Sequence, residues 1–182
     1  MTKTVYIGFC QDIQKKAVDS LISNCNFALK TYSPQNIYIL FASSGGHIGL
    51  AFSLFSFLRS LPVNVITHGV ANIDSCGVNV FLAGNERYAT SNTTFMLHPS
   101  TKRFTNEVSL TINQLHLELV TLQNDQAMVV KNIAENTKIS ATDAEKFINL
   151  GASFKPEQAK QAGIVSEEKD FTMEKNAPFL QI

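Results

Sequence analysis

The chain has 182 residues, of which 45% are hydrophobic, so it is long enough to bury a core of its own. Its 15 basic residues equal its 15 acidic ones, which argues against nucleic acid and against an anionic membrane surface as partners. No apolar stretch approaches the roughly 20 residues needed to cross a bilayer, and the N-terminus lacks the marks of a signal peptide, so we expect a soluble, cytoplasmic protein.

Apolar runs of strand length alternate along the chain with segments whose apolar residues recur every three or four positions. The near-continuous apolar run at 36–42 is typical of a buried parallel strand. Alternating strands and helices predict right-handed crossovers and a parallel sheet, which defines an α/β fold. In chain order we expect a strand at 4–9, a helix at 11–32, strands at 36–42 and 63–71 separated by a helix at 47–61, a short helix at 75–84, a strand at 93–99, a long helix from about 106 to 136, and helices at 140–151 and 155–165.

These segments are interpreted as one domain covering 1–182, with a polar and loosely attached tail from about 166. The three cysteines form no CxxC pair, so neither a disulfide framework nor a metal site is indicated.

A glycine turn follows the strand at 36–42. The residues Ser43-Ser44-Gly45-Gly46 connect it to the next helix, and glycines allow the backbone N–H groups of such a turn to point outward. A turn of this kind suits an anion or a developing oxyanion, although an ordinary glycine turn would look the same. The P-loop pattern GxxxxGKS/T is absent, so phosphate binding has no support.

Ser75 stands where the strand at 63–71 gives way to a short helix. It would act as a nucleophile if a base took its proton and backbone donors, such as the N–H of Cys76, stabilised the oxyanion. The alternative is a helix cap formed by Ser75 or by Asp74. Within this window alone, the cap is the favoured interpretation.

His98 lies at the C-terminal end of the strand at 93–99. Functional groups of open α/β sheets collect beyond the carboxyl ends of the strands, where we also expect the glycine turn and Ser75. This convergence favours His98 as a catalytic base over a histidine that merely ends a strand. His68 is a reserve candidate, although a packed strand histidine is the simpler interpretation.

The stretch from 39 to 99 resembles the core of the ClpP-like serine peptidases, and the resemblance extends over roughly residues 5 to 168. The family's NSPGG loop is similar to Ala42 through Gly46, and its alanine-serine-methionine-glycine segment is similar to Asp74 through Gly77. The family's RYALPNSRVMIHQP is similar to RYATSNTTFMLHPS here, which aligns the catalytic histidine with His98.

The resemblance implies the ClpP/crotonase spiral of stacked ββα units with a long handle helix. It implies Ser75 as nucleophile, His98 as base, and an oxyanion hole formed by Gly45 or Gly46 together with Cys76. It also implies a homo-oligomeric ring, a peptide or unfolded protein as substrate, and no cofactor or metal. The short N-terminus leaves a partnership with an ATPase unfoldase open.

Two departures from the family pattern stand out. Between Gly69 and Ser75 the chain has two more residues than usual, which either displace the nucleophile or lengthen the turn. The third catalytic residue, an aspartate in the family, falls in a segment without any acid, where Asn149 is the nearest polar match. An acid from elsewhere, Asp74 or Glu86, is the alternative.

The leading hypothesis is therefore a ClpP-like serine endopeptidase, and the alternative is a weak or inactive ring subunit of the same fold. A crotonase-type acyl-CoA enzyme is disfavoured because those chains are usually longer and use acidic residues. The apolar face of the long helix predicts burial against a neighbouring subunit.

Overall fold

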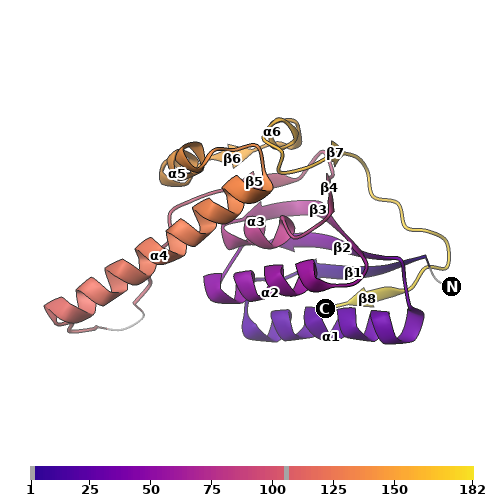
Figure 1. Cartoon of the computed structure of the whole chain (residues 1–182), viewed down its shortest axis with the longest axis horizontal. Helices are drawn as coiled ribbons and strands as arrows, with labels where there is room; N and C mark the ends of the chain where they lie inside the picture. The colour runs from indigo at the N-terminus through magenta and orange to yellow at the C-terminus, as the bar shows by residue number, and fades with distance from the viewer. Residues whose placement is uncertain (1–2, 105–106) are drawn as a thin grey trace.

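A computed structural model describes residues 3–104 and 107–182 as a mixed α/β fold (Figure 1). The strands are β1 (Thr4–Cys10), β2 (Asn36–Ser43), β3 (Asn64–Asp74), β4 (Glu86–Ala89), β5 (Thr94–Met96), β6 (Ser153–Phe154), β7 (Glu167–Glu168) and β8 (Phe179–Gln181). The helices are α1 (Lys15–Tyr32), α2 (Ile48–Ser60), α3 (Cys76–Phe81), α4 (Ile112–Asn136), α5 (Ala141–Leu150) and α6 (Pro156–Gln161).

The strands form a sheet in the order β6-β5-β3-β2-β1-β8, with β4 paired to β3 and β7 paired to β4. All pairs are parallel except β5 with β6, which confirms the parallel sheet expected from the alternation of elements. Parallel strands place their carboxyl ends at one edge of the sheet. The segments that follow β2, β3 and β5 therefore meet there.

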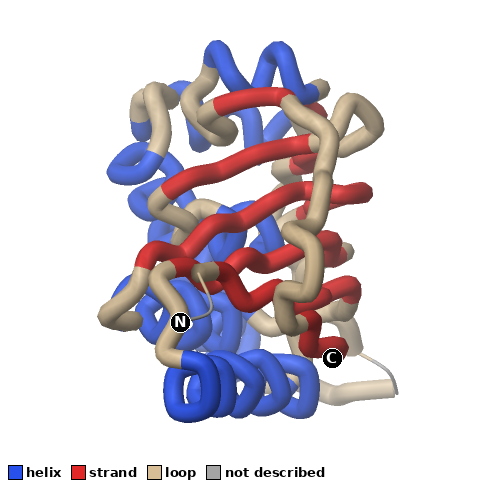
Figure 2. Tube along the Cα trace, turned by 90° about the vertical axis from the view of Figure 1, so that its right-hand side faces the viewer, coloured by secondary structure: helices blue, strands red, loops and turns tan. Residues whose placement is uncertain are grey.

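The two faces of the sheet are covered differently. Side chains alternate between the two faces along each strand. On one face, Ile7 of β1 and Ile39 and Phe41 of β2 pack with α1 and α2 in the main core. Figure 1 shows these helices running along β1 and β2. The opposite face carries Tyr6 and Tyr38, and the C-terminal segment crosses it (Figure 2).

The long helix α4 extends beyond the rest of the molecule as a handle (Figure 1). It begins at Ile112, later than the expected 106, because Thr111 and Gln114 form a capping box that fixes the start of the helix there. Residues 107–111 are not helical, and Asn106 lies outside the described residues.

Strand β3 is longer than expected and continues to Asp74. Phe41 of β2 pairs with Gly69, but Ser43 pairs with Ile73, so β3 uses two more residues than β2 over this interval. This irregularity is a β-bulge that accommodates extra chain within a continuous strand. β3 therefore carries two more residues than β2 does before the turn at Ser75.

Several expectations need correction. The strand β4 and the short strands β6 to β8 were not anticipated, and α3 ends at Phe81 rather than at 84. The tail from about 166 is also not loosely attached, because β7 pairs with β4 and β8 pairs with β1. Among the residues described here, no helix is both long enough and apolar enough to span a membrane.

Candidate active site

Ser75 lies in the turn between β3 and α3 and has an unusual backbone conformation. Its φ is 58° and its ψ is −135°, a backbone region that residues other than glycine rarely occupy. Its N–H donates to the Met96 carbonyl at 2.8 Å, and its carbonyl accepts from the Val78 N–H at 3.1 Å. Its hydroxyl makes no cap hydrogen bond to α3. The geometry therefore differs from that of an ordinary serine cap.

The glycine turn lies directly against Ser75. Gly45 has φ 90° and Gly46 has φ 147°, and a Cβ added at Gly46 would come within 2.4 Å of the Ile13 carbonyl oxygen. The Ile13 N–H donates to the Gly45 carbonyl at 2.7 Å, which fastens the turn to the chain after β1. Both positions thus require glycine, for conformation and for space.

Three backbone N–H groups, those of Gly45, Gly46 and Cys76, lie around the start of α3. The Gly45 N–H is occupied by the Ser43 hydroxyl at 3.1 Å. In the described part of the chain, the N–H groups of Gly46 and Cys76 have no oxygen acceptor. Burial raises the pKa of the Cys76 thiol to about 11, and these two N–H groups oppose that rise, so both lie near its sulfur.

His98 follows β5 and is partly exposed. Its Nδ1 lies 2.9 Å from the Pro99 carbonyl oxygen, which can only accept, so Nδ1 carries a proton and the neutral form of the ring has its lone pair on Nε2. This is the tautomer that a general base requires. No hydrogen bond joins the His98 ring to the Ser75 hydroxyl in the residues that the structure describes.

Ser75 and His98 nevertheless line the same small pocket, with a volume of about 10 Å³. Gln126 of α4 lies in the wall of this pocket. The Gln126 side-chain Nε2 donates to the side-chain oxygen Oδ1 of Asn149 at 3.3 Å. Asn149 itself is exposed on α5 and makes no hydrogen bond to His98 in the described chain. The full lining is Ile48, Ser75, Cys76, Leu97, His98, Ser100, Gln126, Val129 and Ile148.

The two acids suggested as replacements for the missing aspartate lie in different places. Partial burial raises the pKa of the Asp74 carboxyl, and the nearby His98 opposes that rise. Asp74 pairs with Met96 of β5, two residues before His98. Glu86 pairs with Ile66 near the opposite end of β3 and binds Asn64 at 2.7 Å, so it is separate from this site.

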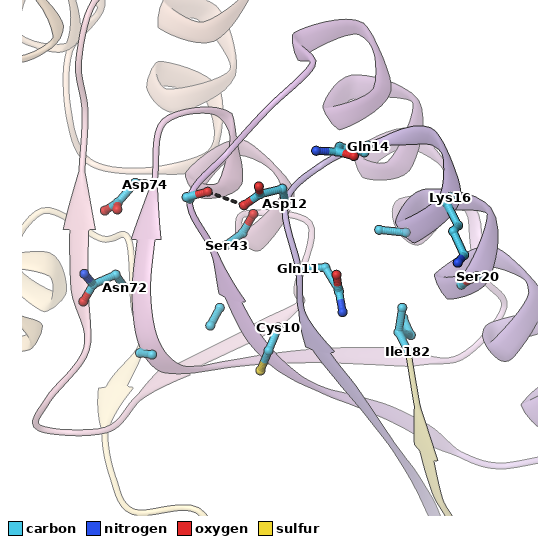
Figure 3. A pocket seen from close by; sticks show the side chains of 14 residues that line it. Cys10, Gln11, Asp12, Gln14, Lys16, Ser20, Ser43, Asn72, Asp74 and Ile182 are labelled. Atoms are coloured by element: carbon cyan, nitrogen blue, oxygen red, sulfur yellow. Dashed lines mark hydrogen bonds between the residues drawn. The ribbon is translucent and has the colours of Figure 1, made fainter.

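A larger pocket of about 870 Å³ opens beside the same sheet edge (Figure 3). Its wall includes Ser44 and Asp74, which flank the glycine turn and the candidate nucleophile. Ser44 also bonds Asp12 after β1, as the dashed line in Figure 3 shows. Ile182, at the end of the C-terminal segment, lies in the opposite wall.

The remaining candidates are structural or distant. The His47 ring caps α2 by accepting from the Leu50 N–H at 3.4 Å, and His68 is fully buried between Tyr38 and Lys169. Sequence reasoning missed Gln126, because nothing marks it among the polar residues of the long helix. In residues 3–104 and 107–182 no cluster of three metal-ligating side chains is found.

The fold is that of the ClpP proteins. An asparagine-to-aspartate mutant of ClpP1 from Listeria monocytogenes superposes with a TM-score of 0.79, covering 93% of this chain and 92% of that one at 20% sequence identity. A handle helix like α4 accompanies this fold, as expected from the sequence.

Sequence comparison identifies the family. The family model described as Clp protease matches residues 1–168, so the chain belongs to the Clp protease family. The ATP-dependent Clp protease proteolytic subunit 2 of Pseudomonas aeruginosa is 28% identical over 153 residues, which cover 80% of this chain and 73% of that protein. Membership in this family supports the expected ClpP-like peptidase.

Proposed function

We propose that the chain is a serine peptidase that cleaves peptides or unfolded proteins, with Ser75 as nucleophile and His98 as general base. The observation that carries the proposal is the strained Ser75 turn, which shares one pocket with His98 and adjoins the N–H groups of Gly46 and Cys76. Strained residues of this kind are concentrated at active sites.

In the proposed reaction, His98 Nε2 takes the Ser75 hydroxyl proton as Oγ forms a bond to the scissile carbonyl carbon. The Gly46 and Cys76 N–H groups then donate to the resulting oxyanion, with Gly45 shaping the turn that presents them. When the C–N bond breaks, His98 returns the proton to the leaving amine. Water repeats these steps on the acyl-enzyme and releases the second product.

The orientation of His98 has two sources in this proposal. The Pro99 carbonyl holds the Nδ1 proton, and the Asp74 carboxylate supplies negative charge near the ring. Asn149 serves as a positioning residue, because it reaches the pocket through the Gln126 amide.

We also propose that the active form is a homo-oligomeric ring. The handle exposes apolar residues on more than one side, at Ile112, Leu115, Leu117, Leu119 and Met128. Apolar patches of this kind mark interfaces between subunits. The relative from Pseudomonas aeruginosa is named as a subunit of an ATP-dependent protease, which is why an ATPase unfoldase stays a proposed partner.

A second candidate function is that of a non-catalytic ring subunit. It is favoured by the lack of a hydrogen bond between Ser75 and His98 among the described residues, and by a histidine Nδ1 that meets a carbonyl rather than an acid. Enzymes often tighten such contacts only when substrate binds, so the two candidates need an experiment.

Labelling with a fluorophosphonate probe distinguishes them. The wild-type chain should be labelled at Ser75, and Ser75→Ala and His98→Ala should each lower labelling and peptide cleavage by about 10⁴-fold. Ser60→Ala is the matched control, because that hydroxyl bonds the Phe57 carbonyl on the surface of α2. A wild-type chain that is neither labelled nor active would establish the non-catalytic candidate.

A further inference from the structure

The segment 169–182 leaves β7, crosses the face of the sheet opposite α1 and α2, and ends beside β1 (Figures 1 and 2). All of its residues are described, and none of them is buried. We refer to this segment as the strap. It is attached at its start, at Phe171 and Glu174 in its middle, and at its end.

At its start, Lys169 is held by three contacts. Its N–H donates to the Ala89 carbonyl at 2.9 Å, and its carbonyl accepts from the His68 Nε2–H at 3.1 Å. Its ammonium group lies 3.2 Å from the centre of the Tyr88 ring, which is within the range of a cation–π contact.

In the middle, Phe171 occupies an aromatic recess on the sheet. Its ring centre lies 5.6 Å from that of Tyr6, 5.8 Å from that of Tyr38 and 5.9 Å from that of His68. These separations are those of favourable aromatic pairs. The following residues, 172–176, are all exposed, so Phe171 is the apolar attachment in the middle of the strap, while Leu180 and Ile182 pack against the core at its end.

At its end, the strap adds a strand to the sheet and reaches the large pocket. The Tyr6 N–H donates to the Pro178 carbonyl at 2.9 Å, and the Ile182 N–H donates to the Gly8 carbonyl at 3.3 Å. Ile182 then forms part of the wall of the 870 Å³ pocket that also contains Ser44 and Asp74. One segment thus links the aromatic recess with the pocket beside Ser75.

We propose that the strap is a displaceable element, held by Phe171 in its middle and by β8 at its end, whose release removes Ile182 from the wall of the pocket and opens the pocket further. A segment with no buried residue and an exposed stretch between its attachments opens at a lower free energy than the core strands do. In this proposal the contacts of Phe171 in the aromatic recess hold the strap on the sheet, and the pocket at the sheet edge widens when the strap is released.

Hydrogen exchange on the full-length chain tests the release itself. In Phe171→Ala, the amides of Tyr6 and Ile182 should exchange about tenfold faster than in the wild type, because three aromatic contacts are lost. Amides of the central strand β2 should keep their rates. Met173→Ala is the matched control, since Met173 lies on the same strap, is 44% exposed and makes no aromatic contact.

Equal exchange in Phe171→Ala and Met173→Ala would overturn the proposal. If Phe171→Ala accelerates exchange in β2 as well, Phe171→Leu decides, because leucine keeps an apolar side chain in the recess. Faster exchange confined to the strap and β1 in Phe171→Leu supports a local release. Global exchange in this variant as well would show that Phe171 belongs to the core, and the strap would not be a separate element.

The effect on the pocket rests on the proposed function and has its own readout. Strap release should speed fluorophosphonate labelling of Ser75, and Met173→Ala should not. Faster exchange with unchanged labelling would disprove the link between strap and pocket. If even the wild type is not labelled while exchange behaves as expected, the proposed catalysis is disproved, but the proposal that the strap is displaceable is supported.

Discussion

Gly45 and Ser75 lie so close together that Gly45 has no room for a side chain. A Cβ built on Gly45 would come within 2.6 Å of the Ser75 Cβ and 3.2 Å of its Oγ. The same added atom would meet the Asp74 carbonyl oxygen at 3.0 Å. The glycine turn after β2 and the strained turn after β3 are therefore fitted to each other, and the position of each depends on the other.

Gly45→Ala should consequently lower Ser75 labelling by about 100-fold, because the added methyl group displaces Ser75. The free energy of unfolding should fall by about 1–3 kcal/mol, since φ 90° is also unfavourable for alanine. Labelling rates and urea unfolding measure the two effects. Gly151→Ala is the control, because Gly151 has φ 70° but nothing lies within 4 Å of an added Cβ. If both variants are labelled at the same rate, the contact is unimportant.

The charge of Asp74 should matter more to turnover than the amide of Asn149. Asp74→Asn should lower kcat/KM about tenfold, because a carboxylate near His98 stabilises the imidazolium that forms. Asn149→Ala should lower it by less than about threefold, because this amide acts only through Gln126. Steady-state cleavage of an unstructured peptide by the two variants gives the comparison. The reverse ranking would identify Asn149 as the direct partner of the histidine.

The core strands and the convergence of the site could be predicted from the sequence, because both follow from short-range patterns. Apolar runs mark β1 and β2, and parallel strands necessarily bring the segments after β2, β3 and β5 to one edge. The bulge in β3 could not be predicted, because it is defined by the register between Phe41 and Gly69 and between Ser43 and Ile73. Register depends on pairing between distant segments.

The attachment of the C-terminal segment and the position of Gln126 in the pocket wall could not be predicted from the sequence, for a different reason. Residues 169–182 are polar in composition, which is typical of a loose end, and they are attached through Phe171 and β8 to a sheet formed far away in the chain. Gln126 likewise has no local signal. Its contact with Asn149 arises because α4 and α5 pack against each other.

His68 should make the stability of the chain depend on pH. Burial lowers the pKa of His68 from 6.5 to about 4, and the hydrogen bond to the Lys169 carbonyl only partly opposes this. Between these values the unfolded chain takes up a proton that the folded chain does not. The free energy of unfolding should therefore fall as the pH decreases from about 6.5 to about 4, by on the order of 3 kcal/mol in total.

Urea unfolding of the wild type and of His68→Gln across this range measures the effect. Carboxylates titrate in the same interval, so the quantity of interest is the difference in slope between the two proteins. The His68→Gln protein should show the weaker pH dependence. Parallel curves would mean that His68 titrates in the folded chain as it does in the unfolded one.

The handle should govern assembly. Leu115 and Leu119 lie one turn apart on the same face of α4 and are 55% and 52% exposed, and a charge at either position would have to be buried if this face packs against a second copy. Leu115→Glu and Leu119→Glu should therefore shift the sedimentation profile at micromolar concentration toward smaller species. Asn124→Glu adds the same charge at an exposed position on a different face of α4 and serves as the control. A wild-type chain that sediments as a monomer would disprove the assembly.

The bulge in β3 shows why this site tolerates a change in chain length. Side chains alternate between the two faces of a strand, so two additional residues restore the original alternation, whereas one would turn every later side chain to the other face. Asp74 and Ser75 therefore keep their orientation although the chain before them is longer. Ala71 and Asn72 are exposed within this interval and line the large pocket. Insertions or deletions of an even number of residues in this interval would therefore alter the rim of that pocket and leave the orientation of the candidate nucleophile unchanged.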